Sequence, residues 1–509
     1  MPQAPGKIWL VGAGAGEPGL ITVRGLSVLA RADVVLYDAL AHPALLEHCP
    51  QAEQRNVGKR YGEDSAAQEA IIAQMIDLAR QGKRVVRLKG GDPLMFARGA
   101  EEALALVEAG VKFEIVPGVS SPVATSAYAG ISLTHRELSS SVTFITGSDR
   151  AGKDWSPEQW KKLATATDTI CVLMGMRRLK EISNAIIEGG RSASTPAAVI
   201  HWGARPEQRV VTAPLERIAE AAAEAGLKNP SIIVVGEVVT LREKLSWYDS
   251  RPLSGKRVVI PRAVEQARDT AAAVRERSAT SVILPMIEIA PPPDAARFAR
   301  AATEMSSYDW VLFTSSNAVE QLRLELERSG ADARAFGTAK VGVVGPKTAE
   351  ALLRLGIKAD AVAKEFVGEG LAGAVLAQGV PRRVLLLRAL AARDALPDAL
   401  RAQGSEVDVV VAYENKPLQS SGAELTARIE AGTADAILFT SSSTVTSTLE
   451  ALGSNGFSLL SRIALCSIGP VTTKTLESVG LKPTVQASVY TVEGLLDALE
   501  QHYRTPASA

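Results

Sequence analysis

Two glycines, an aspartate and a proline, Gly90 to Pro93, follow an apolar, β-branched run at residues 85–88. Such a run is typical of a buried strand, and glycines let a bulky ligand approach the backbone because they have no Cβ. Asp92 places a carboxylate acceptor at the same point. In open α/β sheets, ligands bind beyond the carboxyl ends of the strands. The residues therefore predict either a ligand-binding turn or a tight strand–helix turn without a ligand.

A second glycine-rich loop occupies residues 12–19. It matches a dinucleotide-binding loop poorly, because Glu17 stands where the third glycine belongs and Pro18 follows it. Asp38, at the end of the next predicted strand, resembles the ribose-binding acid of that fold. Because glycine-rich strand–helix turns are common, a nicotinamide-dependent enzyme is disfavoured.

The second half contains an internal repeat: residues 309–319 match 435–445, and residues 344–348 match 468–472. Each copy predicts a strand that enters a hydroxyl-rich turn and then a strand that enters a Gly-Pro turn. Helix N-termini at such turns attract anions such as carboxylates. The alternative is a duplicated lobe whose Ser and Thr residues cap helices.

Composition limits the classes of protein. The 509 residues predict several domains, and 56 basic residues balance 56 acidic ones, which argues against a dedicated nucleic-acid binder. The cysteines, Cys49, Cys171 and Cys466, lack metal-ligand spacing and indicate a reduced, cytoplasmic chain without a metal site. We expect no secretory signal and no membrane span, since the N-terminus lacks the signal pattern and no apolar run approaches 18 residues.

Alternating strand and helix patterns predict an α/β protein with largely parallel sheets. A polar segment with Pro and Gly at residues 249–255 predicts a linker between two large domains. The predicted strands of the first domain are residues 8–11, 33–37, 85–88, 113–116, 141–146, 169–173, 197–200, 209–212 and 231–235. The predicted helices include residues 22–30, 66–80 and 99–109.

Ordered motifs in the first domain carry a family resemblance. They are Val11-Gly12-Ala13-Gly14, Tyr37-Asp38, Val57-Gly58-Lys59-Arg60, the residue 85–93 block, Val116-Pro117-Gly118 and Leu133-Thr134-His135-Arg136. With them, residues 7–248 resemble the uroporphyrinogen-III C-methyltransferases of the tetrapyrrole methylase superfamily. The resemblance implies two lobes, about 7–138 and 139–248, that bind S-adenosylmethionine in the cleft between them.

The resemblance also implies roles for single residues. Asp38 matches the proposed base and Lys59 the proposed acid. The cofactor contacts fall on Ala15, Gly90, Gly91, Asp92, Met95, Ser120, Ser121, Met174 and Gly203. Proline is usual at Ala15 and Thr-Ala at Ser120-Ser121, so side-chain details differ there. Cationic candidates for the substrate carboxylates are Arg60, Arg98, His135 and Arg136, each of which has a solvated surface role as its alternative.

Residues 256–503 resemble uroporphyrinogen-III synthases through two Phe-Thr-Ser-Ser turns, two Gly-Pro turns and Tyr413. The resemblance implies a bilobed α/β fold, with one lobe at about 256–290 plus 416–503 and the other at about 295–412. Tyr413, at the end of a predicted strand at residues 407–411, matches the candidate general acid; its alternative is a half-buried aromatic at a lobe junction. The candidate substrate-binding hydroxyls are Thr314, Ser315, Thr348, Ser441, Ser442 and Thr472.

Together the two resemblances imply a bifunctional cytoplasmic enzyme. It cyclises hydroxymethylbilane to uroporphyrinogen III and methylates that product twice to precorrin-2, releasing S-adenosylhomocysteine. They also imply a homodimer formed through the methyltransferase domain. The alternatives are a methyltransferase acting on a later corrinoid and a second half that binds a tetrapyrrole without catalysis.

Overall fold

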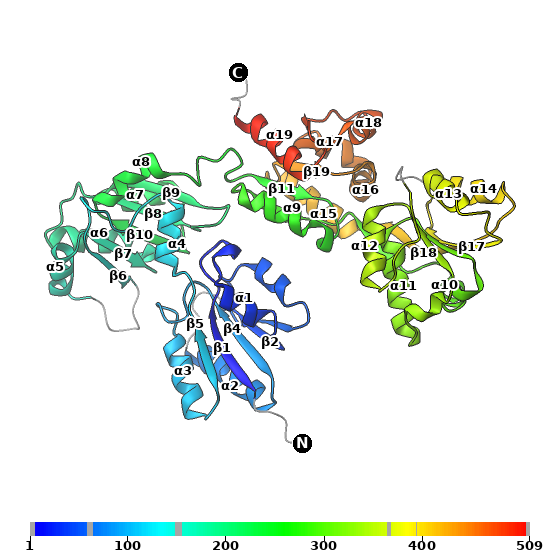
Figure 1. Cartoon of the computed structure of the whole chain (residues 1–509). Helices are drawn as coiled ribbons and strands as arrows, with labels where there is room; N and C mark the ends of the chain where they lie inside the picture. The colour runs from blue at the N-terminus through cyan, green and yellow to red at the C-terminus, as the bar shows by residue number, and fades with distance from the viewer. Residues whose placement is uncertain (1–5, 59–64, 148–154, 364–367, 393, 505–509) are drawn as a thin grey trace. The chain divides into compact units, whose positions relative to one another are not determined.

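The computed structural model describes residues 6–58, 65–147, 155–363, 368–392 and 394–504 (Figure 1). It contains two compact units. The first comprises Met1–Arg257, Ala272–Ser281 and Leu499–Ala509, and the second comprises Val258–Ala271 and Val282–Ala498. Among the described residues, no helix is long and apolar enough to cross a membrane.

The first sheet of the first unit is wholly parallel, with strand order β3-β2-β4-β1-β5. Its strands are β1 (Lys7–Gly12), β2 (Val34–Tyr37), β3 (Glu53–Asn56), β4 (Arg84–Lys89) and β5 (Phe113–Val116). The chain leaves β1 toward one edge of the sheet and leaves β4 toward the other. The carboxyl ends of β1 and β4 therefore form a topological switch point, where such sheets bind ligands.

Helices cover both faces of this sheet. Buried residues of α1 (Val23–Leu29) and of the 3-10 helix η2 (Pro43–His48) pack on one face. The other face packs against α2 (Ser65–Arg80) and α3 (Gly99–Glu108). The central strands β1 and β2 are mostly apolar on both faces for this reason, as parallel strands usually are.

The second sheet, in the order β6-β7-β10-β8-β9, departs from the expectation of largely parallel strands. Only β6 and β7 pair in parallel, while β10 runs antiparallel to both β7 and β8, and β8 runs antiparallel to β9. For β8 and β9 the physical reason is that residues 202–208 are too few for the crossover that parallel neighbours require. The strands are β6 (Val142–Thr146), β7 (Thr169–Leu173), β8 (Pro196–His201), β9 (Arg209–Pro214) and β10 (Ser231–Val235).

Helices α5 (Pro157–Ala166), α6 (Leu179–Glu188) and α7 (Ile218–Glu224) pack on one face of this sheet. The opposite face packs on the 3-10 helix η4 (Glu237–Leu241) and on Ala129 and Ile131, which follow α4 (Ser121–Tyr128). A short helix, α8 (Arg242–Leu245), follows η4.

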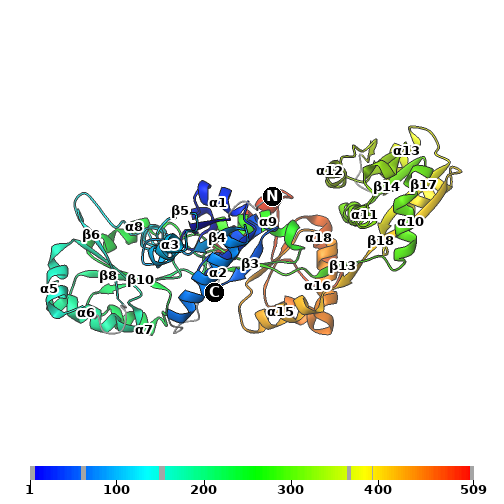
Figure 2. The same cartoon turned by 90° about the horizontal axis from the view of Figure 1, so that it is seen from below.

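The second unit holds two further sheets, which Figure 2 shows from below. One has the order β12-β11-β19-β20-β21 and the other β13-β18-β17-β14-β15-β16. The strands of the first are β11 (Arg257–Ile260), β12 (Thr280–Ile283), β19 (Ala436–Phe439), β20 (Ala464–Ser467) and β21 (Val485–Gln486). Those of the second are β13 (Ile287–Ala290), β14 (Trp310–Phe313), β15 (Lys340–Val343), β16 (Ala361–Val362), β17 (Arg383–Ala389) and β18 (Glu406–Pro417).

Helices follow these strands as the α/β pattern predicts. They are α9 (Val264–Glu276), α10 (Ala295–Thr303), α11 (Ser316–Ser329), α12 (Pro346–Arg354), α13 (Gly368–Leu376), α14 (Ala395–Arg401), α15 (Gln419–Glu430), α16 (Ser442–Leu452), α17 (Gly456–Leu460), α18 (Pro470–Ser478) and α19 (Val492–Arg504). The predicted repeat corresponds to β14 leading into α11 and β19 leading into α16.

A two-stranded antiparallel ribbon joins the two sheets of this unit. In it, β13 pairs with the last part of β18, from Ile287 opposite Pro417 to Ala290 opposite Glu414. The strand predicted to end at Val411 therefore continues to Pro417, because β13 supplies a new partner where β17 ends. Tyr413 lies inside this strand, not after it.

The predicted linker, residues 249–255, is held by contacts within the first unit. Arg242 donates to Asp249, and the Arg251 guanidinium lies 4.8 Å from the Trp247 ring centroid and donates to the carbonyl of Glu276. The domain limits stay predictions.

Candidate functional site

Three glycine turns meet at the carboxyl edge of the first sheet. A Cβ on Gly12, at the end of β1, would lie 2.5 Å from the nitrogen of Gly118 and 2.7 Å from the oxygen of Gly91. A Cβ on Gly118, after β5, would likewise collide with the Gly91 oxygen. Only glycine allows the backbones that follow β1, β4 and β5 to approach this closely.

The turn after β4 is locked to both neighbouring turns. Gly91 and Gly14 exchange two backbone hydrogen bonds, with N···O distances of 2.7 and 3.2 Å. Asp92 accepts from the Leu94 N–H through Oδ1 at 2.9 Å and from the Gly118 N–H through Oδ2 at 3.1 Å. The predicted acceptor Asp92 thus holds its own turn against the turn after β5.

Helix α4 begins beside these three glycine turns. A Cβ on Gly91 would lie 3.3 Å from the nitrogen of Ser121, so the Gly90–Gly91 turn approaches the first turn of the helix. Ser120 is the N-cap residue, and its side chain makes no capping bond. The structure therefore brings Gly91, Asp92, Ser120 and Ser121 together.

The loop after β8 lies against the same group. A Cβ on Gly16 would meet the oxygens of Gly203 and Ala204 at 2.6 Å, and a Cβ on Gly203 would collide with Thr125 of α4. Gly203 and the buried Ala15 thus lie in adjacent, closely packed loops.

Met174 and Met95 complete the predicted cofactor set. Met174 follows β7 with a left-handed backbone, φ 55°, and 48% of its surface is exposed. A non-glycine residue rarely adopts this conformation without a functional or packing constraint. Met95 is half-buried in the turn after Asp92.

Gln208 is a residue that the sequence analysis missed. Its Oε1 accepts from the Ala204 N–H at 2.9 Å, and its Nε2 donates to Asp249 Oδ1 at 2.7 Å and to the Tyr128 carbonyl at 3.2 Å. Gln208 therefore ties the Gly203–Ala204 loop to the end of α4. Its partners are distant in sequence, so the sequence does not show which groups it contacts.

Asp38 follows β2 at the same edge of the sheet, and Arg87 of β4 donates to its Oδ1. Arg87 also contacts Glu102 of α3 at 3.3 Å, and Lys89 contacts the same Glu102 oxygen at 2.9 Å. Burial, followed by the nearby Arg87 charge, lowers the pKa of Lys89. These buried charges were also missed, although two basic residues inside an apolar strand are a visible signal.

Two of the predicted cationic residues, Arg98 and His135, make side-chain contacts with nearby residues of the chain. Arg98 has a left-handed backbone, φ 59°, and a two-nitrogen ion pair with Glu101 at 2.6 and 3.0 Å. His135 accepts from the Glu137 N–H within its own turn, and Arg136 is exposed. Lys59 and Arg60 lie outside the described residues.

In the second unit, Tyr413 and Ser315 form a pair. Their hydroxyl oxygens are 3.0 Å apart, and Tyr413 is 5% exposed. Ser315 also accepts from the Ala318 N–H at 3.2 Å, so it caps α11. Thr314 precedes it and is half-buried.

The second copy of the repeat has the same cap. Ser441 and Thr444 bond reciprocally at the start of α16, while Ser442 accepts from Thr475 at 2.8 Å. Thr348 and Thr472 are both buried in the first turns of their helices. Helix capping, the alternative left open by the sequence, thus applies to Ser315 and Ser441, and capping does not prevent a hydroxyl from donating its own proton.

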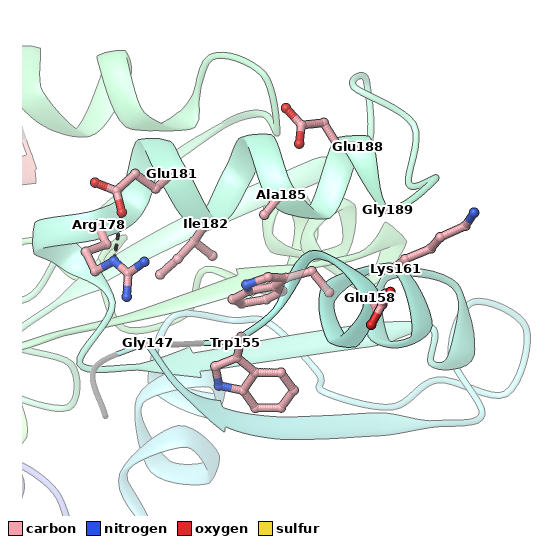
Figure 3. Close-up of a pocket in the computed structure, with 11 residues that line it drawn as sticks. Gly147, Trp155, Glu158, Lys161, Arg178, Glu181, Ile182, Ala185, Glu188 and Gly189 are labelled. Atoms are coloured by element: carbon pink, nitrogen blue, oxygen red, sulfur yellow. Dashed lines mark hydrogen bonds and ion pairs between the residues drawn. The ribbon is translucent and has the colours of Figure 1, made fainter. Parts of the chain in front are cut away.

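A cavity of about 470 Å³ lies between α5 and α6 (Figure 3). Its lining includes Trp155, Trp160, Lys161 and Arg178, and none of the predicted site residues. It therefore adds nothing to the candidate site. Within the described ranges, no cluster of His, Cys, Asp and Glu has the makings of a metal site.

Comparison with known proteins identifies both halves. Residues 7–219 match the family model for Tetrapyrrole (Corrin/Porphyrin) Methylases, and residues 268–497 match that for Uroporphyrinogen-III synthase HemD. The Porphyrin biosynthesis protein HemD of Ruminiclostridium josui is 36% identical over 97% of this chain and 97% of its own length. The Uroporphyrinogen-III C-methyltransferase of Bacillus subtilis (strain 168) is 43% identical over 48% of this chain and 95% of its own.

Among solved structures, the uroporphyrin-III C-methyltransferase of Thermus thermophilus complexed with S-adenyl homocysteine is 36% identical. It covers 46% of this chain and 99% of its own, with a TM-score of 0.41. The R. josui protein aligns over nearly its full length, and the two family models occupy successive halves. The chain therefore belongs to the porphyrin biosynthesis proteins that join a tetrapyrrole methylase to a HemD-type uroporphyrinogen-III synthase.

Proposed function

We propose that this chain cyclises hydroxymethylbilane to uroporphyrinogen III and then methylates it twice, using S-adenosylmethionine, to precorrin-2. Its family membership assigns it the synthase and the C-methyltransferase activities. The observation that carries the methyltransferase assignment is the glycine floor formed by Gly12, Gly91 and Gly118, with Asp38 at the same sheet edge.

The residues fit the methyl donor. Added side chains on Gly90, Gly91 and Gly203 would crowd or collide with Leu40, Ser121 and Thr125, so these glycines keep the turns at this sheet edge close together. The Ser120 side chain makes no capping bond beside them. When bound, S-adenosylmethionine supplies an activated methyl group. The chain has to orient the donor and acceptor and exclude water, which is how positioning accelerates a transfer.

In the methyltransferase half, Asp38 is assigned the role of proton acceptor. A tetrapyrrole carbon that accepts a methyl cation leaves its ring with a positive charge, and a proton must then leave. The Asp38 carboxylate, held by Arg87, can face that charge and take up the proton. Because Lys59 lies outside the described residues, its role as acid is proposed from the family resemblance alone.

In the synthase half, ring closure begins with loss of a hydroxyl group as water, so a proton donor is needed. Tyr413, joined to Ser315, is the donor that we assign to this step. The hydroxyls of Thr314, Ser315, Thr348, Ser441, Ser442 and Thr472 are assigned to the substrate carboxylates.

Two assays on the purified full chain test these activities separately. Uroporphyrinogen III with methyl-labelled donor should yield a product that carries two labels, and hydroxymethylbilane alone should yield the type III ring. Absence of label defeats the methyltransferase assignment. Formation of only the type I ring means that the second half binds without catalysing. We also place the enzyme in the cytoplasm as a homodimer, and a monomeric mass in sedimentation would refute the dimer.

A further inference from the structure

A buried charge cluster connects α3 to Asp38 through β4. Glu102 is fully buried, and Arg87 and Lys89 are each 2% exposed. Glu102 Oε1 accepts from Arg87, from Lys89 and, at 2.8 Å, from Gln68 of α2. The cluster thus contains two cations and two carboxylates once Asp38 is included.

The Arg87 side chain is fixed from several directions. Its Nη1 donates to the carbonyl oxygens of Leu36 at 3.3 Å and Leu88 at 3.4 Å, one on each of the adjacent strands β2 and β4. Its Nε faces Glu102, and its Nη2 donates to Asp38 Oδ1. A guanidinium held at all three nitrogens is a rigid donor.

Asp38 is the member of the cluster that reaches solvent. Its side chain is 28% exposed, whereas the side chains of Arg87 and Glu102 are 3% and 0% exposed. Arg87 binds Oδ1, and among the described residues Oδ2 has no hydrogen-bond partner. Arg87 therefore anchors one oxygen, and within the described ranges the other has no protein partner at the carboxyl edge of the sheet.

A contribution to the stability of the fold does not by itself explain these buried ion pairs. Buried ion pairs are costly to desolvate, and well-packed apolar side chains of similar volume are often as stable. Here the buried cluster of Lys89, Glu102 and Arg87 ends at Asp38, a residue of the candidate active site, which Arg87 contacts. A function in orienting that residue accounts for their position.

We propose that Arg87 is a positioning residue for Asp38, with Glu102 holding Arg87 in place. This inference rests on the proposed methyltransferase function. Arg87 fixes the carboxylate through Oδ1 so that Oδ2 meets the proton or the positive charge of the ring that has taken up the methyl group. The transferred methyl replaces one proton overall, and that proton goes to Oδ2 and then to solvent.

The test measures methylation of uroporphyrinogen III by the full chain with Arg87→Met and Arg87→Lys. A misplaced catalytic group typically costs about 10- to 100-fold, so Arg87→Met should lower kcat by about that factor. The KM values for both substrates should stay within about threefold, because Arg87 touches neither. Arg87→Lys, which keeps the charge, should recover part of the loss.

The matched control is Arg84→Met on the same strand. Arg84 pairs with Asp33 at 2.6 Å at the opposite end of β4, so its loss should leave kcat unchanged. Coupling is tested in the Asp38→Asn background, where adding Arg87→Met should cause no further loss. A merely structural role would reduce the rate equally in both backgrounds.

Folding of each variant is followed by circular dichroism. If Arg87→Met unfolds, Arg87→Met with Glu102→Gln removes one charge of each sign and tests the same contact. If that variant also unfolds, the test becomes the kcat of methylation by Arg87→Lys, which should be lower than that of the wild type. A folded Arg87 variant with wild-type kcat, or multiplicative losses with Asp38→Asn, overturns the inference. A wild-type chain that transfers no methyl group refutes the proposed function instead.

Discussion

The Oδ2 atom of Asp92 accepts a hydrogen bond from the backbone N–H of Gly118 at 3.1 Å, which ties the turn after β4 to the turn after β5. The carboxylate thereby fixes the turns after β4 and β5, which form one side of the proposed cofactor site. We propose that Asp92 affects cofactor binding through the backbone geometry of these turns.

Replacing Asp92 with Ala should weaken binding of the methyl donor. Two backbone N–H groups lose their charged acceptor, and bonds of this kind contribute about 1.5–3 kcal/mol each. We expect affinity to fall by about tenfold or more in calorimetric titration, where tenfold corresponds to about 1.4 kcal/mol. Asp33→Ala, which removes an ion pair with Arg84, is the control. Equal affinity in both variants would contradict the role of Asp92.

Gly118→Ala should disrupt the junction of the turns after β1, β4 and β5, where Gly12, Gly91 and Gly118 meet. The added methyl group collides with the oxygen of Gly91, and forced overpacking typically costs about 1–3 kcal/mol. Gly19→Ala is the control in the first loop, because the nearest atom to its Cβ would be 3.7 Å away. Thermal melts and donor titration should separate the two variants. Normal donor binding by Gly118→Ala would show that the junction does not shape the site.

Tyr413→Phe should slow ring closure and leave methylation of supplied uroporphyrinogen III unchanged. The substitution removes the hydroxyl that pairs with Ser315 while keeping the buried ring. Loss of a general acid costs about 100-fold or more when the group is essential. We expect about tenfold here, since the reactive substrate supplies much of the driving force.

The control for that experiment is Tyr308→Phe in the same lobe. Tyr308 donates to Asp408 at 2.9 Å, and burial together with this bond raises its pKa to about 12. Its loss should affect stability and not the rate of cyclisation. Equal rates of cyclisation in the two variants would remove Tyr413 from the mechanism.

Glu114→Gln should change the pH dependence of stability. Hydrogen bonds from Lys7 and Arg24 lower the pKa of Glu114 to about 2. Since the folded-state pKa lies below the unfolded value, the stabilisation is present above about pH 4.5 and is lost as the pH falls toward 2. The variant should lose about 1 kcal/mol at pH 7, and its difference from wild type should shrink in acid denaturation series. A constant difference down to pH 2 would contradict the ion-pair account.

Much of the fold follows from local sequence patterns. The predicted strands 113–116, 169–173 and 231–235 coincide with β5, β7 and β10, because compact apolar runs end at clear turn signals. Strand β3, Glu-Gln-Arg-Asn, carries no apolar signal, since it is a short edge strand with mostly exposed side chains. The antiparallel pairing of β8 and β9 depends on loop length, which the alternating pattern alone does not reveal.

The candidate site was predictable where one residue type is required. Gly12, Gly91 and Gly118 stand out because no other residue allows their close approach. Gln208 and Glu102 did not, because their roles depend on partners from distant segments. Arg87 was visible as a basic residue inside an apolar strand, but its partners Asp38 and Glu102 were not. Tyr413 and Ser315 were both predicted as site residues, but their pairing depends on how β18 passes the start of α11.

The most direct test supplies one purified chain with hydroxymethylbilane and methyl-labelled S-adenosylmethionine together. Mass spectrometry and isomer analysis then identify the macrocycle that forms. The account predicts a type III ring carrying two labelled methyl groups, made without any added enzyme. A ring without label, or a type I ring as the sole product, would contradict the claim that this chain performs both steps.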